Sequence, residues 1–219
     1  MHESDDESLK EDAAKGSYSF EIDKTIPYWE IGDIVLSTLP AKAEEDEALE
    51  PKFTFANFGT IAHAYMEAAV TGGEPVIKER EFAGLENKKK SIEKIKSICA
   101  EMALKFKNSS LGAQVAECMS AQRFIKAEYS FRSRLKDSIL KGTIDLVFEN
   151  PDGTFTIVDY KTNQSVKPEI YYMQLACYRQ AVAAMLGVKD VSTIRCMLYY
   201  LRFGEVVDIT EQCSKISVE

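Results

Sequence analysis

Apolar and polar residues follow two different periods along the chain, and the period separates predicted helices from predicted strands. Apolar side chains that recur every three or four residues predict helices, at residues 55–70, 86–107, 111–121 and 169–187. Shorter apolar runs between turn-forming residues predict strands, at residues 124–135, 139–149, 154–161, 193–202 and 205–209. This order of elements predicts an α/β fold in which helices flank a mixed central sheet.

Residues 142–161 predict a β-hairpin whose strands carry charge within apolar runs. Turn-forming residues occupy 150–153 and end in a glycine, so the two strands should be antiparallel neighbours. Asp145 interrupts the first strand. Asp159 and Lys161 interrupt the second strand on one common side, because side chains alternate along a strand. Burying these charges costs several kcal/mol unless something compensates them, as a divalent metal with a bound phosphate would.

The same residues carry a resemblance to a known family. Gly142-Thr-Ile-Asp145, followed after a gap by Asp159-Tyr-Lys161, resembles the signature of the PD-(D/E)XK nucleases. Further features resemble the subgroup found in RecB-type and AddA-type helicase-nucleases, Cas4 and lambda-type exonucleases. They are His63 in a predicted helix, Glu128 ahead of the hairpin, and Gln174-x-x-x-Tyr178 after it. The match runs in the family's order over residues 52–205 and implies the restriction-endonuclease-like fold.

The resemblance implies hydrolysis of DNA phosphodiester bonds by a metal-activated water. His63, Asp145 and Asp159 would hold one or two Mg²⁺ or Mn²⁺ ions, and the backbone carbonyl of Tyr160 would add a ligand. Lys161 would orient the attacking water or stabilise the transition state. The resemblance also implies exonuclease action in DNA repair or recombination. The implied partners are DNA and a helicase domain or subunit.

Three further residues of the pattern have two interpretations each. Gln174 and Tyr178 lie on one face of a predicted helix. That face either contacts sugar-phosphate and bases or is an ordinary amphipathic face with half-exposed tyrosines. Glu128 either supports the metal site or forms an ion pair with Arg132 or Lys141.

Two other functions are compatible with the chain. A non-catalytic DNA-binding or scaffolding module can keep the same fold. It is disfavoured because His63, Asp145, Asp159 and Lys161 are all present, and a decayed site usually loses at least one such residue. An unrelated enzyme could use the two aspartates as an acid/base pair, but that does not explain the lysine or the polar helix face.

Charge divides the chain into two parts. Residues 1–50 hold 15 acidic and 4 basic residues, a net charge of −11, whereas residues 51–219 hold 20 acidic and 23 basic residues, a net charge of +3. We therefore expect an acidic N-terminal extension over 1–50, partly packed on the body, and a nuclease domain over 51–219. The overall charge of −8 does not exclude DNA as a partner, since the acidity is confined to the extension.

Cysteine usage and hydropathy bear on the compartment. The five cysteines are scattered, odd in number and without a Cys-x-x-Cys pair, so we expect neither a disulfide scaffold nor an iron–sulfur cluster. No apolar run approaches the roughly 18 residues of a membrane span, and the acidic start does not resemble a secretory leader. The expected location is therefore the reducing cytoplasm, with no membrane partner.

Overall fold

The centre of the molecule is a six-stranded mixed sheet. The computed structural model describes residues 28–30, 53–85, 87–135 and 138–218. The strands are β1 (Tyr28–Glu30), β2 (Ile125–Leu135), β3 (Ser138–Glu149), β4 (Phe155–Lys161), β5 (Arg195–Tyr200) and β6 (Glu205–Asp208). They follow the order β1-β3-β4-β5-β6, and β2 also pairs with β3. The pairs β1–β3 and β4–β5 are parallel and the others antiparallel.

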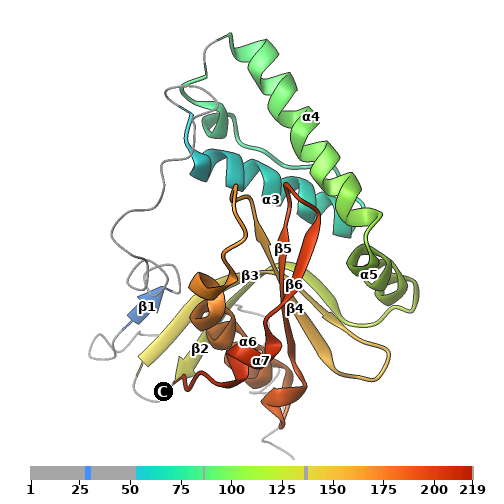
Figure 1. The fold of residues 1–219 in the computed structure, drawn as a ribbon, viewed down its shortest axis with the longest axis vertical. Helices are drawn as coiled ribbons and strands as arrows, with labels where there is room; N and C mark the ends of the chain where they lie inside the picture. Colours follow the sequence, from blue (N-terminus) through green and yellow to red (C-terminus); the bar gives the residue numbers. More distant parts are fainter. Residues whose placement is uncertain (1–27, 31–52, 86, 136–137, 219) are drawn as a thin grey trace, which may run out of the picture.

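Helices cover both faces of this sheet (Figure 1). One face carries α3 (Phe55–Thr71), α4 (Lys88–Lys107) and α5 (Ser110–Ser120), and the other carries α6 (Tyr172–Leu186) and α7 (Thr210–Ser214). Short 3₁₀ helices connect them: η2 (Glu79–Phe82), η3 (Pro168–Tyr171) and η4 (Val191–Thr193). Within the described ranges, no helix has the length and apolar character needed to cross a membrane. The predicted α/β arrangement of a mixed sheet between helices is confirmed.

The two central strands supply a separate hydrophobic core on each face. Leu146 and Val158 pack on the side of α3 to α5, whereas Val147 and Ile157 pack on the side of α6. All four are fully buried, because successive side chains of a strand point to opposite faces. This double burial fixes the register of β3 against β4, and with it the position of every polar residue on the two strands.

The predicted hairpin turn is confirmed between β3 and β4. The backbone N–H of Asn150 donates to the carbonyl of Thr154 at 2.8 Å, and the N–H of Gly153 donates to the carbonyl of Asn150 at 3.0 Å. Gly153 has a φ of +80°, which a glycine adopts without steric cost.

Two predicted elements have different bounds in the structure. The helix predicted over 169–187 begins with η3 at Pro168, and α6 proper starts at Tyr172. The strand predicted over 193–202 is shorter at its start, because the Asp190 side chain accepts the Ser192 N–H at 2.9 Å and holds η4 instead. β1 was not predicted as a strand. The rest of the acidic extension lies outside the described residues.

Candidate metal centre and active site

The site lies where β3 separates from β4. β1 pairs with residues 139–141 of β3 and β4 pairs with residues 146–149, so the described strands leave residues 142–145 unpaired along that edge. Asp145 lies at the end of this gap, and its Oδ2 accepts the backbone N–H of Tyr160 at 2.6 Å. The carboxylate thus satisfies a backbone donor that would otherwise be buried without a partner, and its orientation is fixed.

Glu128 interrupts β2 directly across from this gap. The pairing of β2 with β3 is regular on both sides of Glu128 but omits it. Its φ is 46°, a left-handed conformation that costs on the order of 1–3 kcal/mol in a residue other than glycine. The Oε1 atom lies 3.6 Å from Nδ1 of His63. The distorted backbone therefore accompanies a side chain placed in the site.

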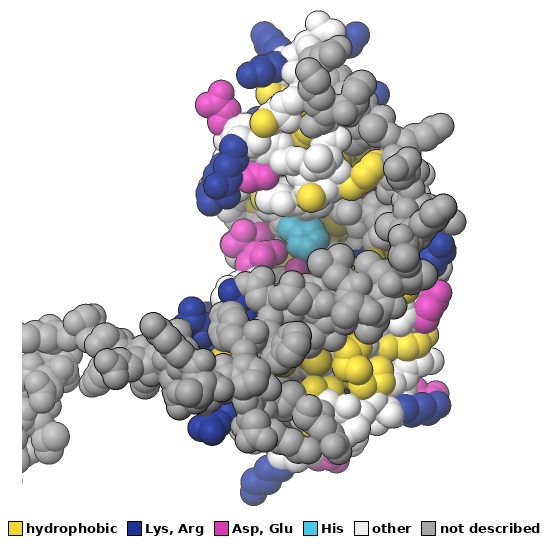
Figure 2. Space-filling model, turned by 90° about the vertical axis from the view of Figure 1, so that its left-hand side faces the viewer, with side chains coloured by type: hydrophobic (Ala, Val, Ile, Leu, Met, Phe, Trp, Pro, Cys, Tyr) yellow, Lys and Arg dark blue, Asp and Glu magenta, His cyan; other side chains and the backbone are white. Residues whose placement is uncertain are grey.

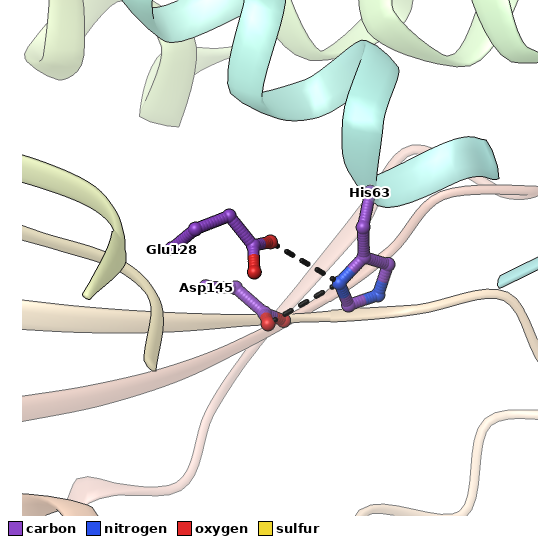
Figure 3. Close-up of side chains that lie close together, drawn as sticks. All are labelled: His63, Glu128 and Asp145. Atoms are coloured by element: carbon purple, nitrogen blue, oxygen red, sulfur yellow. Dashed lines mark ion pairs between the residues drawn. The ribbon is translucent and has the colours of Figure 1, made fainter. Parts of the chain in front are cut away.

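His63 reaches the same point from α3 (Figure 3). The Thr54 side chain caps this helix by accepting the Asn57 N–H at 3.2 Å, and Gly72 ends it in a left-handed conformation. Nδ1 of His63 lies 3.2 Å from Oδ1 of Asp145. Its Nε2 lies 3.2 Å from the carbonyl oxygen of Tyr160. The imidazole carried by α3 therefore meets groups from three strands, β2, β3 and β4.

The donor atoms at this point suit a hard divalent cation. His63, Glu128 and Asp145 each offer one ligand atom, and these atoms lie within 4.8 Å of one another. The carbonyl of Tyr160 adds an oxygen on the other side of the imidazole. Carboxylate and carbonyl oxygens suit Mg²⁺, and an added imidazole suits Mn²⁺ as well. Of the residues that the structure describes, only these three form a metal-compatible group of this kind.

A second charged group lies beside the first. Nζ of Lys161 is 2.5 Å from Oδ2 of Asp159 and donates to Oε1 of Gln174 at 3.2 Å. The Gln174 amide in turn donates to the hydroxyl of Tyr178 at 3.0 Å. The ammonium also lies 3.7 Å from the centre of the Tyr171 ring, a cation–π contact. Lys161 is thus held by contacts on several sides.

The tyrosines of α6 and η3 differ from the expected half-exposed face. Tyr171 and Tyr178 are 8% and 5% exposed. Tyr178 packs edge-on against Phe131 with ring centres 5.8 Å apart. Gly142 on β3 leaves room for this packing, because a Cβ there would lie 3.1–3.2 Å from both rings and the rings would have to shift by a few tenths of an ångström. In the structure, the Tyr178 hydroxyl accepts a hydrogen bond from the Gln174 amide, and Oε1 of Gln174 accepts one from Lys161.

The electrostatics of the site favour the charged form of Asp145 and disfavour the charged form of Asp159. Burial opposes charge on Asp145, but His63, Lys161 and the Tyr160 N–H outweigh it and lower the pKa of Asp145 below 3.8. For Asp159, burial and the nearby Asp145 carboxylate raise the pKa to about 6 despite Lys161. Burial opposes charge on His63 as well, yet Asp145 and Glu128 raise the pKa of His63 well above 6.5. An added cation would relieve this crowding of negative charge.

The structure brings together some of the expected residues more closely than others. His63, Asp145 and the carbonyl of Tyr160 meet as one group. Asp159, expected among the metal ligands, contacts Lys161. Glu128, expected only in support, contributes a ligand atom to the group of three. Its left-handed backbone has no signal in the sequence, since an ordinary strand residue is expected at that position.

Among solved structures, the chain resembles a protein from Eubacterium rectale that is provisionally named an exonuclease. The identity is 12%, the TM-score is 0.42, and the match covers 79% of this chain and 65% of that protein, less than two thirds of its length. It also resembles the structure of a protein called SSO0001, with 13% identity, a TM-score of 0.33 and coverage of 92% of this chain and 72% of that one. No curated protein matches the chain.

The family is shown by a comparison that spans most of the chain. A model of the PD-(D/E)XK nuclease superfamily matches residues 36–214. This range contains both charged groups, the hairpin that carries the aspartates, and the helix that carries the histidine. With the sheet, the hairpin and the converging side chains in agreement, the chain belongs to the PD-(D/E)XK nuclease superfamily.

Proposed function

We propose that this nuclease hydrolyses DNA phosphodiester bonds with the help of Mg²⁺ or Mn²⁺. The observation that supports the proposal is the convergence of His63, Glu128 and Asp145 from three separate elements, within 4.8 Å. A charged cluster of this kind is costly to bury without a counter-ion. A divalent cation bound there would lower the pKa of a coordinated water and neutralise charge that develops on the phosphate.

The roles of the protein groups follow from their positions. His63 would bind the cation through Nδ1 together with Asp145 and Glu128, with Asp159 completing the set. The Tyr160 carbonyl, which lies at Nε2, would hold the imidazole in that orientation. Lys161 offers donors that can move from Asp159 to a phosphate oxygen or an attacking water. Gln174, which accepts from Lys161 at 3.2 Å, would keep the ammonium oriented while it does so. Tyr178 would hold Gln174 in turn.

The biological setting is a further part of the proposal. The ordered motif resembles that of helicase-nucleases, and we therefore propose exonuclease action in DNA repair or recombination, alongside a helicase domain or subunit. The family match supports the nuclease chemistry, and the motif order alone supports this context.

A cleavage assay tests the chemistry. The protein is incubated with single- and double-stranded DNA, labelled at the 5′ or the 3′ end, in Mg²⁺, Mn²⁺ or EDTA. We expect metal-dependent cleavage by the parent and a loss of about 10²-fold or more in Lys161→Ala. Lys189→Ala removes an exposed lysine beyond the end of α6 and should cleave like the parent. Tight DNA binding without cleavage in any metal would favour the non-catalytic binding module.

A further inference from the structure

A pocket of about 630 Å³ adjoins the candidate metal centre. Its lining includes His63 and Glu128, together with Lys78 and Arg80 from the segment around η2. In Figure 2 the histidine lies in a recess of the surface, with acidic and basic side chains gathered around it. The volume falls within the range of small-ligand sites, about 300–1,000 Å³, and suits one or two nucleotides.

The chemistry of the lining matches the two halves of a nucleotide. Ala64, Val76 and Ile77 provide an apolar surface, and Val76 is 83% exposed. Lys78 and Arg80 provide exposed cations close to it. Proteins that hold single strands combine basic side chains along the backbone with aromatic side chains on which the bases stack. The pocket offers the basic side chains and, in place of aromatic rings, an apolar surface beside the metal ligands.

Arg80 is free to change partners. Its Nε lies 3.0 Å from Oε1 of Glu81, and its side chain is 75% exposed. The Glu81 side chain is only 13% exposed, so the arginine end of this ion pair faces solvent and the carboxylate end does not. Glu81 also accepts a hydrogen bond from the Asn57 amide at 3.4 Å, so its carboxylate keeps a partner when the arginine leaves. A phosphate can therefore reach the guanidinium from the solvent side.

The charge balance of the pocket links strand binding to the cation. Its lining has three carboxylates, Glu67, Glu81 and Glu128, against the two cations Lys78 and Arg80. Leaving His63 aside, the carboxylates exceed the cations by one, and a protonated His63 would balance them. A divalent cation at the adjoining site would add two positive charges, and a bound ion is often the largest local charge in a site. Strand binding is therefore expected to weaken in EDTA.

We propose that this pocket binds the nucleotide next to the scissile phosphate, and that the substrate reaches the site as a single strand. This inference rests on the proposed function and names its substrate form. Asp145 and Asp159 are 8% and 2% exposed, and the pocket reaches the site through His63 and Glu128. Its volume is that of a small-ligand site, which an unpaired nucleotide of a flexible single strand can enter and a duplex cannot.

Fluorescence anisotropy with a labelled oligothymidylate of about 12 nucleotides tests the pocket. Binding is measured in Mg²⁺ on the non-cleaving Asp159→Asn background, with Lys78→Ala and Arg80→Ala singly and together. The double variant should bind about tenfold more weakly, and the slope of log K against log salt should fall by about 0.7 per lost phosphate contact. Lys189→Ala should change neither quantity.

Cleavage by the same variants on the wild-type background provides the second measurement. Lys78→Ala and Arg80→Ala should raise KM and leave kcat near the parent value, because they contact a neighbouring nucleotide and not the reacting phosphate. Single-stranded DNA should be cleaved faster than a duplex of the same sequence. Unchanged affinity and salt slope in the double variant would overturn the inference, as would faster cleavage of the duplex.

These outcomes separate the pocket from the nuclease proposal. A parent that cleaves DNA while the double variant binds normally refutes the pocket and leaves the nuclease intact. A parent that cleaves no DNA in any metal refutes the proposed function, and with it the assignment of this pocket to a reacting strand.

Discussion

Two clusters of buried polar residues lie on β3, on β4 and in the turn between them, and they are built in opposite ways. At the hairpin turn, Asn150 and Thr156 are 8% and 0% exposed. At the far end of the pairing, Asp145 and Asp159 are 8% and 2% exposed. The same pair of strands therefore carries a neutral cluster at one end and a charged cluster at the other.

In the neutral cluster, the side chains hydrogen-bond to one another. The Asn150 amide donates to the hydroxyls of Thr154 and Thr156 at 2.9 and 3.0 Å. The hydroxyl of Thr156 lies 3.1 Å from Oδ1 of Asn150 and can donate to it. A buried polar network whose members all have partners stabilises the fold and needs no ligand.

In the charged cluster, contacts between the side chains do not offset the cost of burying charge. Asp159 has a raised pKa because burial and Asp145 disfavour its charge, and Glu128 adopts a left-handed φ of 46° across from Asp145. Such features are costly and persist where function requires them. Burial of polar residues alone therefore does not mark a site, whereas burial of charged residues with a shifted pKa and nearby backbone strain does.

Asp159→Asn should produce the largest effect and separate activity from stability. We expect the cleavage rate to fall by about 10²-fold or more. The thermal midpoint in EDTA should not fall, because the substitution removes a buried charge that burial and Asp145 disfavour by more than Lys161 stabilises it. The two measurements are a cleavage assay and thermal unfolding. A variant that unfolds far below the parent would show that the charged cluster stabilises the fold like the neutral one.

Glu128→Gln should act on metal binding. The substitution keeps the size of the side chain and removes one negative charge, so Mn²⁺ affinity should fall by about 10–100-fold, the usual range for groups that ligate or support a metal. Titration calorimetry measures this. Glu117→Gln is a suitable control, because Glu117 pairs with Arg123 on the surface of α5. Equal affinities of parent and Glu128→Gln would remove Glu128 from the site.

Thr156→Val, in the neutral cluster, should lower stability and leave cleavage nearly unchanged. The change preserves shape but leaves Asn150 short of a buried partner, which costs about 1–3 kcal/mol in the free energy of unfolding. Cleavage per folded molecule should stay within about twofold of the parent. Chemical denaturation and the cleavage assay give the two values. A large loss of activity at full stability would show that this cluster also serves the reaction.

The smallest expected effect is a pH dependence of the metal-free protein. The folded pKa of Asp159 is raised from 3.8 to about 6. Its contribution to stability is therefore fully present below pH 3.8 and is lost as pH rises through about 6. Relative to Asp159→Asn, the thermal midpoint of the parent should fall as pH rises over this interval, because only the parent loses a proton there. Parallel curves for the two proteins would contradict the raised pKa.

The parts of the fold that depend on local pattern could be predicted from the sequence. The hairpin was predictable because turn formers at 150–153 separate two alternating apolar runs. The helix that carries His63 was predictable because its apolar spacing ends at a glycine, which the structure places in the left-handed conformation at Gly72. The fold class follows from the order of these elements.

The remaining features depend on contacts between distant segments. The pairing of β1 with β3 joins residues that are over 100 positions apart, and a three-residue strand has little pattern of its own. The burial of Tyr178 depends on the space above Gly142 in another strand, which a helical period does not report. The left-handed backbone of Glu128 follows from its position across from Asp145. Because the sequence does not report this backbone conformation, Glu128 was expected only in a supporting role.

The central claim is that His63, Glu128 and Asp145, from α3, β2 and β3, together bind a divalent cation. Titration calorimetry of Mn²⁺ into the parent and into Asp145→Asn tests it most directly. The account predicts saturable binding to the parent, and a loss of at least about 10-fold in affinity when this carboxylate is replaced. A parent that binds no Mn²⁺, or an Asp145→Asn variant that binds it equally well, would contradict the account.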